Sequence, residues 1–331
     1  TYLVSLAATN YTKWTEYYNH PGGSMPVEFY SYPESRAFMQ AGVADIVPQL
    51  EAFSQPGAFG EYPFINEKYG IAQFTWGGGM EHQTVSSQGS VAGWLSAHEL
   101  AHQWWGDAIT CETWHDIWLN EGFATFSEAL WEELKPGGSM AGYFSRMQVR
   151  KPQSTQGTVY VYNPINVSNI FSSTNVYRKG AWVVHMLRGA LGDTDFFQAL
   201  ADYRAAYEDD SATTAEFRAS VEQTIGRDMN WFFDQWVMNG GSPAYRYAWT
   251  NKNVGGQDYL YVEIDQYQSS QPVFTMPVPL RVTTGSGTVD VKVWNDERTD
   301  QMVVALPAPA SSVSLDPDQW ILRGSPTTRG Y

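Results

Sequence analysis

Two histidines and a glutamate stand together in the segment Ala97-His98-Glu99-Leu100-Ala101-His102. Histidines four positions apart lie on one face of a helix, one turn apart, so both imidazoles can reach a single metal ion. Glu99 adjoins the first histidine, where its carboxylate can face the open side of the metal and act as a base toward water. The motif alone is moderately specific, because three fixed residues recur by chance in roughly a few per cent of chains of this length.

A third candidate ligand, Glu121, follows His102 after 18 intervening residues, which is enough for a loop that returns a second helix to the side of the first. Two histidines and one glutamate leave the fourth position of a tetrahedral zinc site open, as in catalytic rather than structural sites. Cys111 is the only cysteine, so neither an internal disulfide nor a cysteine-rich metal site can form. The sequence therefore predicts one Zn²⁺ per chain, against the alternative that these are ordinary polar residues on a helix pair.

Helices must hold these residues in place. Ser90 is positioned to cap a helix over residues 91–105, and a second helix over residues 116–134 is expected to end before Pro136-Gly137-Gly138. Four more helices are predicted at residues 176–191, 194–207, 214–225 and 229–239. Together these segments form a predicted helical subdomain around the candidate site.

Strand-like segments lie on both sides of the helical region. Short β-like runs at residues 2–7, 26–31 and 69–76, with one helix near residues 35–53, predict a small sheet before it. After residues 240–243 the pattern changes to alternation, as at residues 259–264 and 289–294, which indicates an all-β module of about 90 residues. The predicted fold class is α+β, with a small mixed sheet and a helical subdomain followed by a β-sandwich.

Composition limits the partners of the chain. Its 331 residues include 35 acidic and 20 basic ones, and the net charge of -15 argues against a nucleic-acid partner, because phosphate binding needs a basic face. There is no run of 18 apolar residues, so no membrane segment is expected. The chain starts at Thr1 without a leader or an initiator Met, so it looks trimmed there. A periplasmic or secreted bacterial location is favoured over a cytoplasmic one, although the single cysteine fits either side of a membrane.

Four segments stand in a recognisable order and spacing: Gly78-Gly79-Met80-Glu81-His82, His98 to His102, Trp118 to Phe126 and Val176-Tyr177-Arg178-Lys179-Gly180. In this order the chain resembles the M1 (gluzincin) zinc aminopeptidases, relatives of aminopeptidase N and leukotriene A4 hydrolase. The resemblance extends over nearly the whole chain. It implies the last strand of an otherwise missing N-terminal β domain at residues 1–10, a thermolysin-like catalytic domain at residues 11–240 and a β-sandwich domain at residues 241–331.

The resemblance also implies roles for individual residues. Glu99 would take a proton from the zinc-bound water as it attacks the scissile carbonyl, and the Tyr177 hydroxyl would donate a hydrogen bond to the oxyanion that forms. Glu81 would bind the free α-amino group of the substrate, while Gly78 and Gly79 let the substrate backbone approach closely. These roles would make the site that of an exopeptidase.

Supporting residues follow from the same comparison. Glu128 lies seven positions after Glu121, on the same helix face, and would orient a zinc-binding histidine, with an exposed helix glutamate as the alternative. Asn120 is expected to support the site in the same way, and Asp116 is a further candidate. His82 stands where the family commonly has Asn, and its titratable ring beside the amine pocket is expected to affect the pH profile or the specificity.

The resulting hypothesis is a zinc-dependent aminopeptidase core that removes N-terminal residues from peptides with a free N-terminus. One alternative is a thermolysin-like zinc endopeptidase, favoured if a cleft left open by the missing domains accepts internal bonds. Another is an inactive scaffold fragment. Glu81 argues against the endopeptidase, and the intact ligand set with Glu99 and Tyr177 argues against the scaffold.

Overall fold

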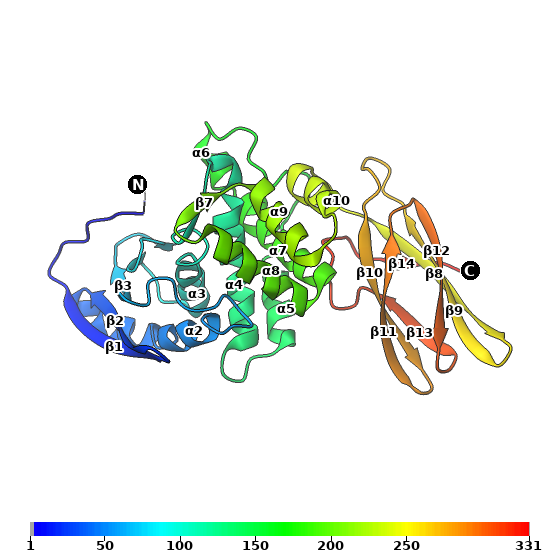
Figure 1. Ribbon diagram of the computed structural model, residues 1–331, viewed down its shortest axis with the longest axis horizontal. Coiled ribbons are helices and arrows are strands. Elements are labelled where there is room, and N and C mark those ends of the chain that lie inside the picture. Colours follow the sequence, from blue (N-terminus) through cyan, green and yellow to red (C-terminus); the bar gives the residue numbers. More distant parts are fainter. Residues whose placement is uncertain (1–2, 331) are drawn as a thin grey trace. The chain divides into compact units, whose positions relative to one another are not determined.

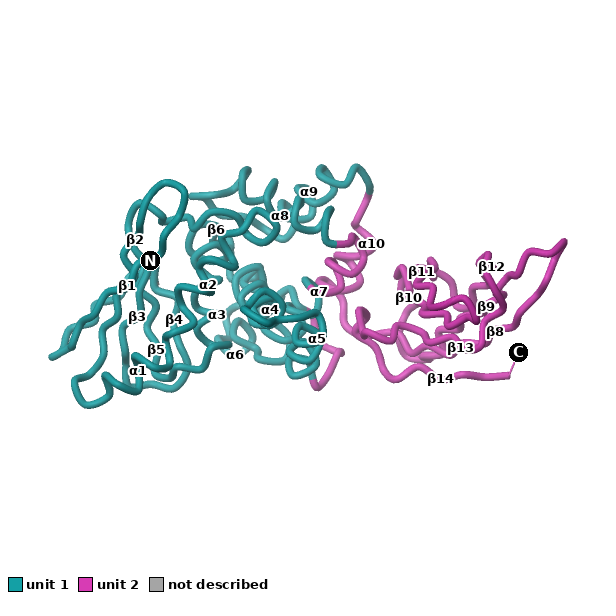
Figure 2. Tube along the Cα trace, turned by 90° about the horizontal axis from the view of Figure 1, so that it is seen from below, with its two compact units in different colours: residues 1–152, 159–184, 193–227 teal, residues 153–158, 185–192, 228–331 magenta. Residues whose placement is uncertain are grey.

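The computed structural model describes residues 3–330 (Figure 1). Its contacts divide the chain into two compact units (Figure 2). Unit 1 comprises the chain up to Pro152 together with Val159–Val184 and Asp193–Arg227, and unit 2 comprises Gln153–Thr158, His185–Gly192 and the chain from Asp228 onward. The two units are each built from several separate segments of the chain. The predicted domains, residues 1–10, 11–240 and 241–331, are instead continuous segments taken from the resemblance to a family, so the two divisions are of different kinds. The predicted boundaries therefore stay a prediction.

Unit 1 contains a five-stranded mixed sheet. Its strands are β1 (Thr12–His20), β2 (Gly23–Ser31), β3 (Tyr69–Gln73), β4 (Gly79–Met80) and β5 (Ser86–Gln88), in the order β1-β2-β3-β5-β4. The β1–β2 hairpin and the β4–β5 pair are antiparallel, while β3 pairs in parallel with β2 and β5. Strand β4 thus forms the edge of the sheet, with its outer side free of a neighbouring strand.

Helices make up most of the rest of unit 1. They are α1 (Arg36–Gly42), α2 (Ile46–Phe53), α3 (Gly93–Ala101), α4 (Trp118–Leu134), α5 (Met140–Val149), α6 (Val167–Ile170), α8 (Asp193–Tyr207) and α9 (Thr214–Ile225). The 3₁₀ turns η1 (Pro33–Ser35) and η2 (Trp114–Asp116), the π-helix η3 (Ser173–Lys179) and the short parallel pair β6 (Ile109–Cys111) and β7 (Asp210–Ala212) connect them. Helix α4 is buried on all sides from Trp118 to Trp131, as expected of a helix with few polar positions.

Unit 2 contains two sheets. Strands β12 (Thr299–Leu306), β9 (Gln257–Gln266), β8 (Tyr245–Val254) and β14 (Thr327–Thr328) form one, and β11 (Gly287–Asn295), β10 (Met276–Thr284) and β13 (Ala310–Leu315) form the other. Alternate residues of β10 are buried, and the hydroxyl of Tyr247 in β8 donates a hydrogen bond to the Val313 carbonyl in β13, 2.9 Å away. These contacts join the two sheets face to face, so the predicted α+β class with a following β-sandwich is confirmed.

Several predicted elements differ from the structure. The strand expected at residues 2–7 is absent from its described part, residues 3–7, because this segment has no strand beside it with which to exchange hydrogen bonds. The single helix expected at residues 35–53 is divided at residues 43–45 into α1 and α2. Helix α3 begins after Ala92, which makes no side-chain capping bond, so Ser90 is not its cap. The helix expected at residues 229–239 consists of α10 (Asn230–Phe233) and a π-helix, η4 (Asp234–Met238).

Helix α7 (Gly180–Leu191) carries a buried histidine in its unit 2 portion. His185 Nε2 donates a hydrogen bond to the Gln319 carbonyl at 3.1 Å, and its ring stacks on Trp320 with the centroids 4.8 Å apart. Burial is the main cause that lowers the pKa of His185 to about 3; the hydrogen bond to the Gln319 carbonyl opposes it, and the positive charge of Arg188 acts in the same direction as burial. The imidazole is therefore neutral in the folded protein at every pH above this value.

This histidine is expected to make stability depend on pH. Between the unfolded pKa of about 6.5 and the folded pKa, only the unfolded chain binds the proton, so stability is full above pH 6.5 and falls as the pH decreases. We expect His185 alone to lower the free energy of unfolding by about 3 kcal/mol between pH 7 and pH 4. Urea unfolding followed by tryptophan fluorescence should show this slope in wild type and in the control His20→Gln, and a shallower one in His185→Gln. An unchanged slope in His185→Gln would contradict the assignment.

Candidate active site

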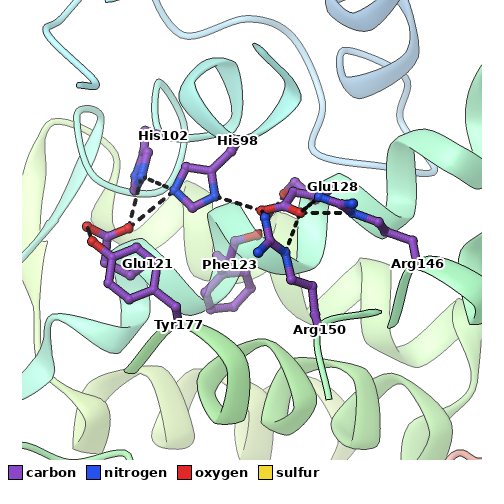
Figure 3. Close-up of polar contacts among 9 residues, drawn as sticks. His98, His102, Glu121, Phe123, Glu128, Arg146, Arg150 and Tyr177 are labelled. Carbon is purple, nitrogen blue, oxygen red and sulfur yellow. Dashed lines mark hydrogen bonds and ion pairs between the residues drawn. The ribbon is translucent and has the colours of Figure 1, made fainter. Parts of the chain in front are cut away.

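Helices α3 and α4 bring the three predicted metal ligands together (Figure 3). His98 Nε2 and His102 Nε2 lie 3.2 Å apart, and each lies 3.3–3.4 Å from Glu121 Oε2. Zinc bonds of about 2.0–2.1 Å at tetrahedral angles separate neighbouring ligand atoms by about 3.3–3.4 Å, so this triangle has the size of one face of a zinc tetrahedron. Glu121 Oε2 is buried without a hydrogen-bond donor in residues 3–330, which also fits a carboxylate that awaits a cation.

The outer nitrogens of both imidazoles are engaged. His102 Nδ1 donates to the Trp105 carbonyl at 3.1 Å, and His98 Nδ1 donates to Glu128 Oε1 at 3.3 Å. A proton held at Nδ1 fixes the tautomer in which Nε2 carries a free lone pair. Both rings therefore present the correct atom to a metal.

The electrostatics of the three ligands favour a positive charge between them. Burial lowers the pKa of both histidines, but the carboxylates of Glu121 and Glu128 close to His98 outweigh this effect and raise its pKa to about 9. For His102 the negative charges of Glu81 and Glu121 do the same and raise its pKa to about 10. The two histidines in turn hold the pKa of Glu121 well below its usual range, although burial opposes this.

Two further carboxylates face the same site. Glu99 and Glu81 are only 4% and 6% exposed, and neither side chain has a hydrogen-bond partner within the described chain. Ligand atoms of Glu81, Glu99 and His102 all lie within 4.8 Å of one another. Burial raises the pKa of Glu99 to about 7, and the charges of Glu81 and Glu121 raise it while the histidines lower it. A carboxylate in this setting can accept and release a proton near neutral pH.

The glycines before Glu81 fit closely around Glu99. A Cβ on Gly79 would lie 2.3 Å from Glu99 Oε1 and 2.5 Å from its Cδ, so the Glu99 carboxylate would have to move toward the cavity that it lines. Gly78 has a φ of +89°, a conformation that other residues rarely adopt. Because Gly78 and Gly79 have no side chains, the Glu99 carboxylate can lie against Gly79 and the edge strand β4 stays accessible from the cavity.

Gly79→Ala is expected to displace the Glu99 carboxylate. We expect kcat/KM to fall about tenfold to hundredfold, because misplacing a catalytic group by about 1 Å can cost a hundredfold in rate. Gly77→Ala is the matched control, since a Cβ there meets nothing within 4 Å. Steady-state kinetics on both variants decide the matter: equal rates would show that Glu99 does not depend on Gly79.

Tyr177 reaches the ligand set from the π-helix η3. Its hydroxyl donates to Glu121 Oε1 at 2.8 Å, and its ring lies parallel to that of His98. Burial, together with Glu121, raises the pKa of Tyr177 far above its usual value, which keeps the hydroxyl protonated as a donor. Helix α4 can approach the segment that follows Tyr177 because a glycine from each meets at the contact. A Cβ on Gly122 would lie 2.9 Å from the Gly180 carbonyl carbon.

Glu128 is the centre of an ion-pair cluster behind His98. It is fully buried and accepts hydrogen bonds from Arg146 and from Arg150, whose Nε lies 2.7 Å away (Figure 3). The two guanidinium carbons lie 5.0 and 4.7 Å from the centre of the Trp94 ring. This cluster fixes the carboxylate that in turn holds His98.

The remaining predicted supports lie elsewhere in the network. Asn120 Oδ1 accepts a hydrogen bond from the Cys111 backbone at 3.2 Å, which ties α4 to β6. Asp116 accepts bonds from the backbone and hydroxyl of Thr214, and so joins the start of α4 to the start of α9. His82 Nδ1 lies 3.0 Å from the Ser87 hydroxyl, and burial lowers the pKa of its ring.

A cavity of about 460 Å³ opens over these residues. Besides the predicted site residues it is lined by residues to which the sequence analysis assigned no role, among them Trp94, Thr125, Arg150, Phe171 and Arg178. Thr125 carries a findable signal, since it lies between Glu121 and Glu128 on one face of α4. Arg178 directly follows Tyr177 in a segment that the sequence analysis recognised, whereas nothing in the local sequence marks Trp94, Arg150 or Phe171. None of the helices in residues 3–330 is long and apolar enough to cross a membrane.

Comparisons with known proteins agree with this geometry. Residues 80–236 match the family described as Peptidase family M1 domain. Aminopeptidase N of Lactococcus lactis subsp. cremoris is 33% identical over 172 residues, covering 50% of this chain and 20% of the relative. Probable aminopeptidase 2 of Sulfurisphaera tokodaii is 29% identical over 211 residues, covering 61% and 26%. The chain thus spans about a quarter or less of these relatives.

A solved structure shares the fold. The crystal structure of Legionella pneumophila aminopeptidase A in complex with aspartic acid superimposes with a TM-score of 0.78 and covers 97% of this chain and 38% of that one. Only 16% of the aligned residues are identical, so the likeness concerns the fold alone.

Proposed function

The chain carries a domain of peptidase family M1, and from this premise we propose that it is the core of a zinc-dependent aminopeptidase. The observation that carries the proposal is the triangle of His98 Nε2, His102 Nε2 and Glu121 Oε2, with edges of 3.2–3.4 Å, beside two buried carboxylates in one cavity. The donor set and its size suit zinc, whose affinity for imidazole and carboxylate ligands is well established. A zinc ion bound there supplies Lewis-acid chemistry, which polarises a carbonyl and lowers the pKa of water to near neutral.

The residues of the chain take distinct parts in the proposed reaction. Glu99, buried beside the ligand triangle, accepts a proton from the attacking water and passes it to the leaving amine. The Tyr177 hydroxyl exchanges its present acceptor, Glu121 Oε1, for the oxygen of the scissile carbonyl as negative charge develops there. Both groups are largely buried at the wall of the cavity, where such interactions are stronger than in water.

Glu81 would give the reaction its direction along the peptide. Its buried carboxylate has no hydrogen-bond partner in residues 3–330, and a substrate ammonium group would satisfy it. A peptide whose amine is held there presents its first peptide bond to the ligand triangle. Peptides with a free N-terminus are therefore the proposed substrates.

One comparison tests the proposal. An alanyl 4-nitroanilide with a free amine should be hydrolysed, its N-acetyl form should not, and a chelator should abolish turnover until zinc is restored. Equal cleavage of both forms would support an endopeptidase instead. Zinc uptake without turnover of either form would favour an inactive scaffold.

A further inference from the structure

The two ends of the cavity carry opposite charges. Glu81 and Glu99 lie beside His102 at one end. At the other end Arg150 lies beside Glu128, on the side of His98 that faces away from His102 (Figure 3). Arg178 lines the same cavity. We refer to Arg150 and Arg178 as the basic end.

The basic end has more positive than negative charge. Arg146 and Arg150 share a single carboxylate, that of Glu128. The guanidinium of Arg178 donates to the carbonyls of Val149 and Lys151 at 3.1 and 3.2 Å, and has no carboxylate partner in the described chain. Two guanidinium groups therefore share the Glu128 carboxylate, and a third, that of Arg178, is bound to the carbonyls on either side of Arg150, in a protein whose net charge is -15. An uncompensated cation against the overall charge favours an anionic ligand.

These guanidinium groups are held in place rather than extended into solvent. Arg150 packs against the Trp94 ring, and the hydrogen bonds of Arg178 anchor it at the end of α5. A pre-positioned guanidinium loses little freedom when it binds, and its planar donors suit the two oxygens of a carboxylate.

A second, independent feature lies between the metal ligands and the basic end. Thr125 is 1% exposed, it borders the cavity, and its Oγ1 has no hydrogen-bond partner within residues 3–330. An unmatched hydroxyl of this kind costs free energy unless a ligand completes it. It lies one helical turn beyond Glu121, on the way to Glu128.

We propose that the basic end binds a carboxylate of the substrate on the leaving-group side of the scissile bond. The inference rests on the proposed function, in which Glu81 holds the amine and the first carbonyl lies at the ligand triangle. The peptide then continues past His98 toward Arg150 and Arg178. The carboxylate is either the C-terminus of a dipeptide or an acidic side chain of the second residue.

Kinetics on matched substrates test the inference. The metal-loaded protein should hydrolyse alanyl-alanine with a KM about tenfold to hundredfold below that for alanyl-alaninamide, since a charge-assisted hydrogen bond is lost in the amide. Alanyl-aspartamide against alanyl-asparaginamide distinguishes the two sources of the carboxylate. A preference in either pair supports the inference, and a preference in neither overturns it. A preference confined to aspartyl over asparaginyl 4-nitroanilide would place the carboxylate on the first residue and overturn the leaving-side assignment.

Variants assign the preference to the basic end. Arg178→Gln should bring the ratio of acid to amide close to one, whereas Arg178→Lys should retain most of it. Arg218→Gln removes the same charge from α9, outside the cavity, and should leave the ratio unchanged. Arg150→Gln should also bring the ratio close to one. The metal content of this variant must be measured too, because Arg150 holds Glu128, which in turn holds His98. A ratio that survives both glutamine variants would contradict the proposed residues.

A binding measurement separates this inference from the proposed function. Calorimetry with the metal-loaded Glu99→Gln variant should give a lower Kd for alanyl-alanine than for its amide, without any turnover. Equal Kd values would overturn the inference even if the protein hydrolyses alanyl 4-nitroanilide. If the two Kd values differ but the wild-type protein hydrolyses no aminoacyl anilide, the proposed function would be refuted and the carboxylate-binding site would still be supported.

Discussion

Glu99→Gln is expected to leave the bound metal in place and to lower kcat by about a thousandfold or more. The amide has nearly the same shape as the carboxylate, and Glu99 belongs to the cavity wall rather than to the triangle of metal ligands. Glutamine cannot accept a proton, so the water would lose its base while binding of the substrate amine at Glu81 stays intact. Metal content by atomic emission and kcat on an aminoacyl anilide measure the two effects separately.

A control substitution keeps this experiment specific. Glu51→Gln removes the same charge from the exposed face of α2 and should leave both metal content and kcat unchanged. Loss of metal in Glu99→Gln would mean that Glu99 is a ligand, and a decrease in kcat of less than about tenfold would remove it from the role of general base.

Glu121→Gln should have the second large effect, on metal affinity. The substitution removes the negative charge of the ligand triangle and leaves a single amide oxygen to serve both as a metal ligand and as the acceptor of the Tyr177 hydroxyl. Outer-sphere partners of metal ligands typically contribute about 10–100-fold in affinity, so a direct ligand should contribute more than a hundredfold. Zinc affinity measured by competition with a chromogenic chelator gives the value, and turnover should disappear at limiting zinc.

A graded series on α4 tests the order of these contributions. Glu128→Gln should weaken zinc by about 10–100-fold, because it holds His98 from behind. Glu132→Gln lies farther along α4, pairs with Lys135 and should have no effect. If Glu128→Gln weakened zinc as much as Glu121→Gln, the division between ligand and support would be wrong.

Local signals explain which elements the sequence predicted well. Helix α9 was predicted with its observed bounds because both ends are marked: Thr213 and Glu216 form a capping box, and Gly226 ends the helix in the left-handed conformation. Strand β1 was missed because residues 12–20 are mostly polar, show no regular alternation of polar and apolar side chains, and bury only Tyr18. The strand expected at residues 2–7 rested on apolar composition, which does not supply a pairing partner.

The site divides in the same way. His98, His102 and Glu121 are set by helical spacing and one short return, so their meeting could be predicted. Arg178 adjoins Tyr177 in a recognised segment, but Arg150 reaches the cavity through the packing at the end of α5, which no local pattern encodes. The roles of the predicted residues remain predictions until the variants above are measured.

The π-helical winding of η3 places Tyr177 at Glu121, and its amide bonds five residues back, to the Ser172 carbonyl. Such winding is uncommon because it packs its backbone less well than an α-helix. Loss of one residue between Tyr177 and Gly180 would allow α-helical winding and turn the tyrosine by about 100° away from the ligand set. Variants selected only for resistance to heat could therefore lose the π-helical winding of η3 and, with it, the position of the Tyr177 hydroxyl. Variants selected for turnover would have to keep η3, although it is less stable than an α-helix.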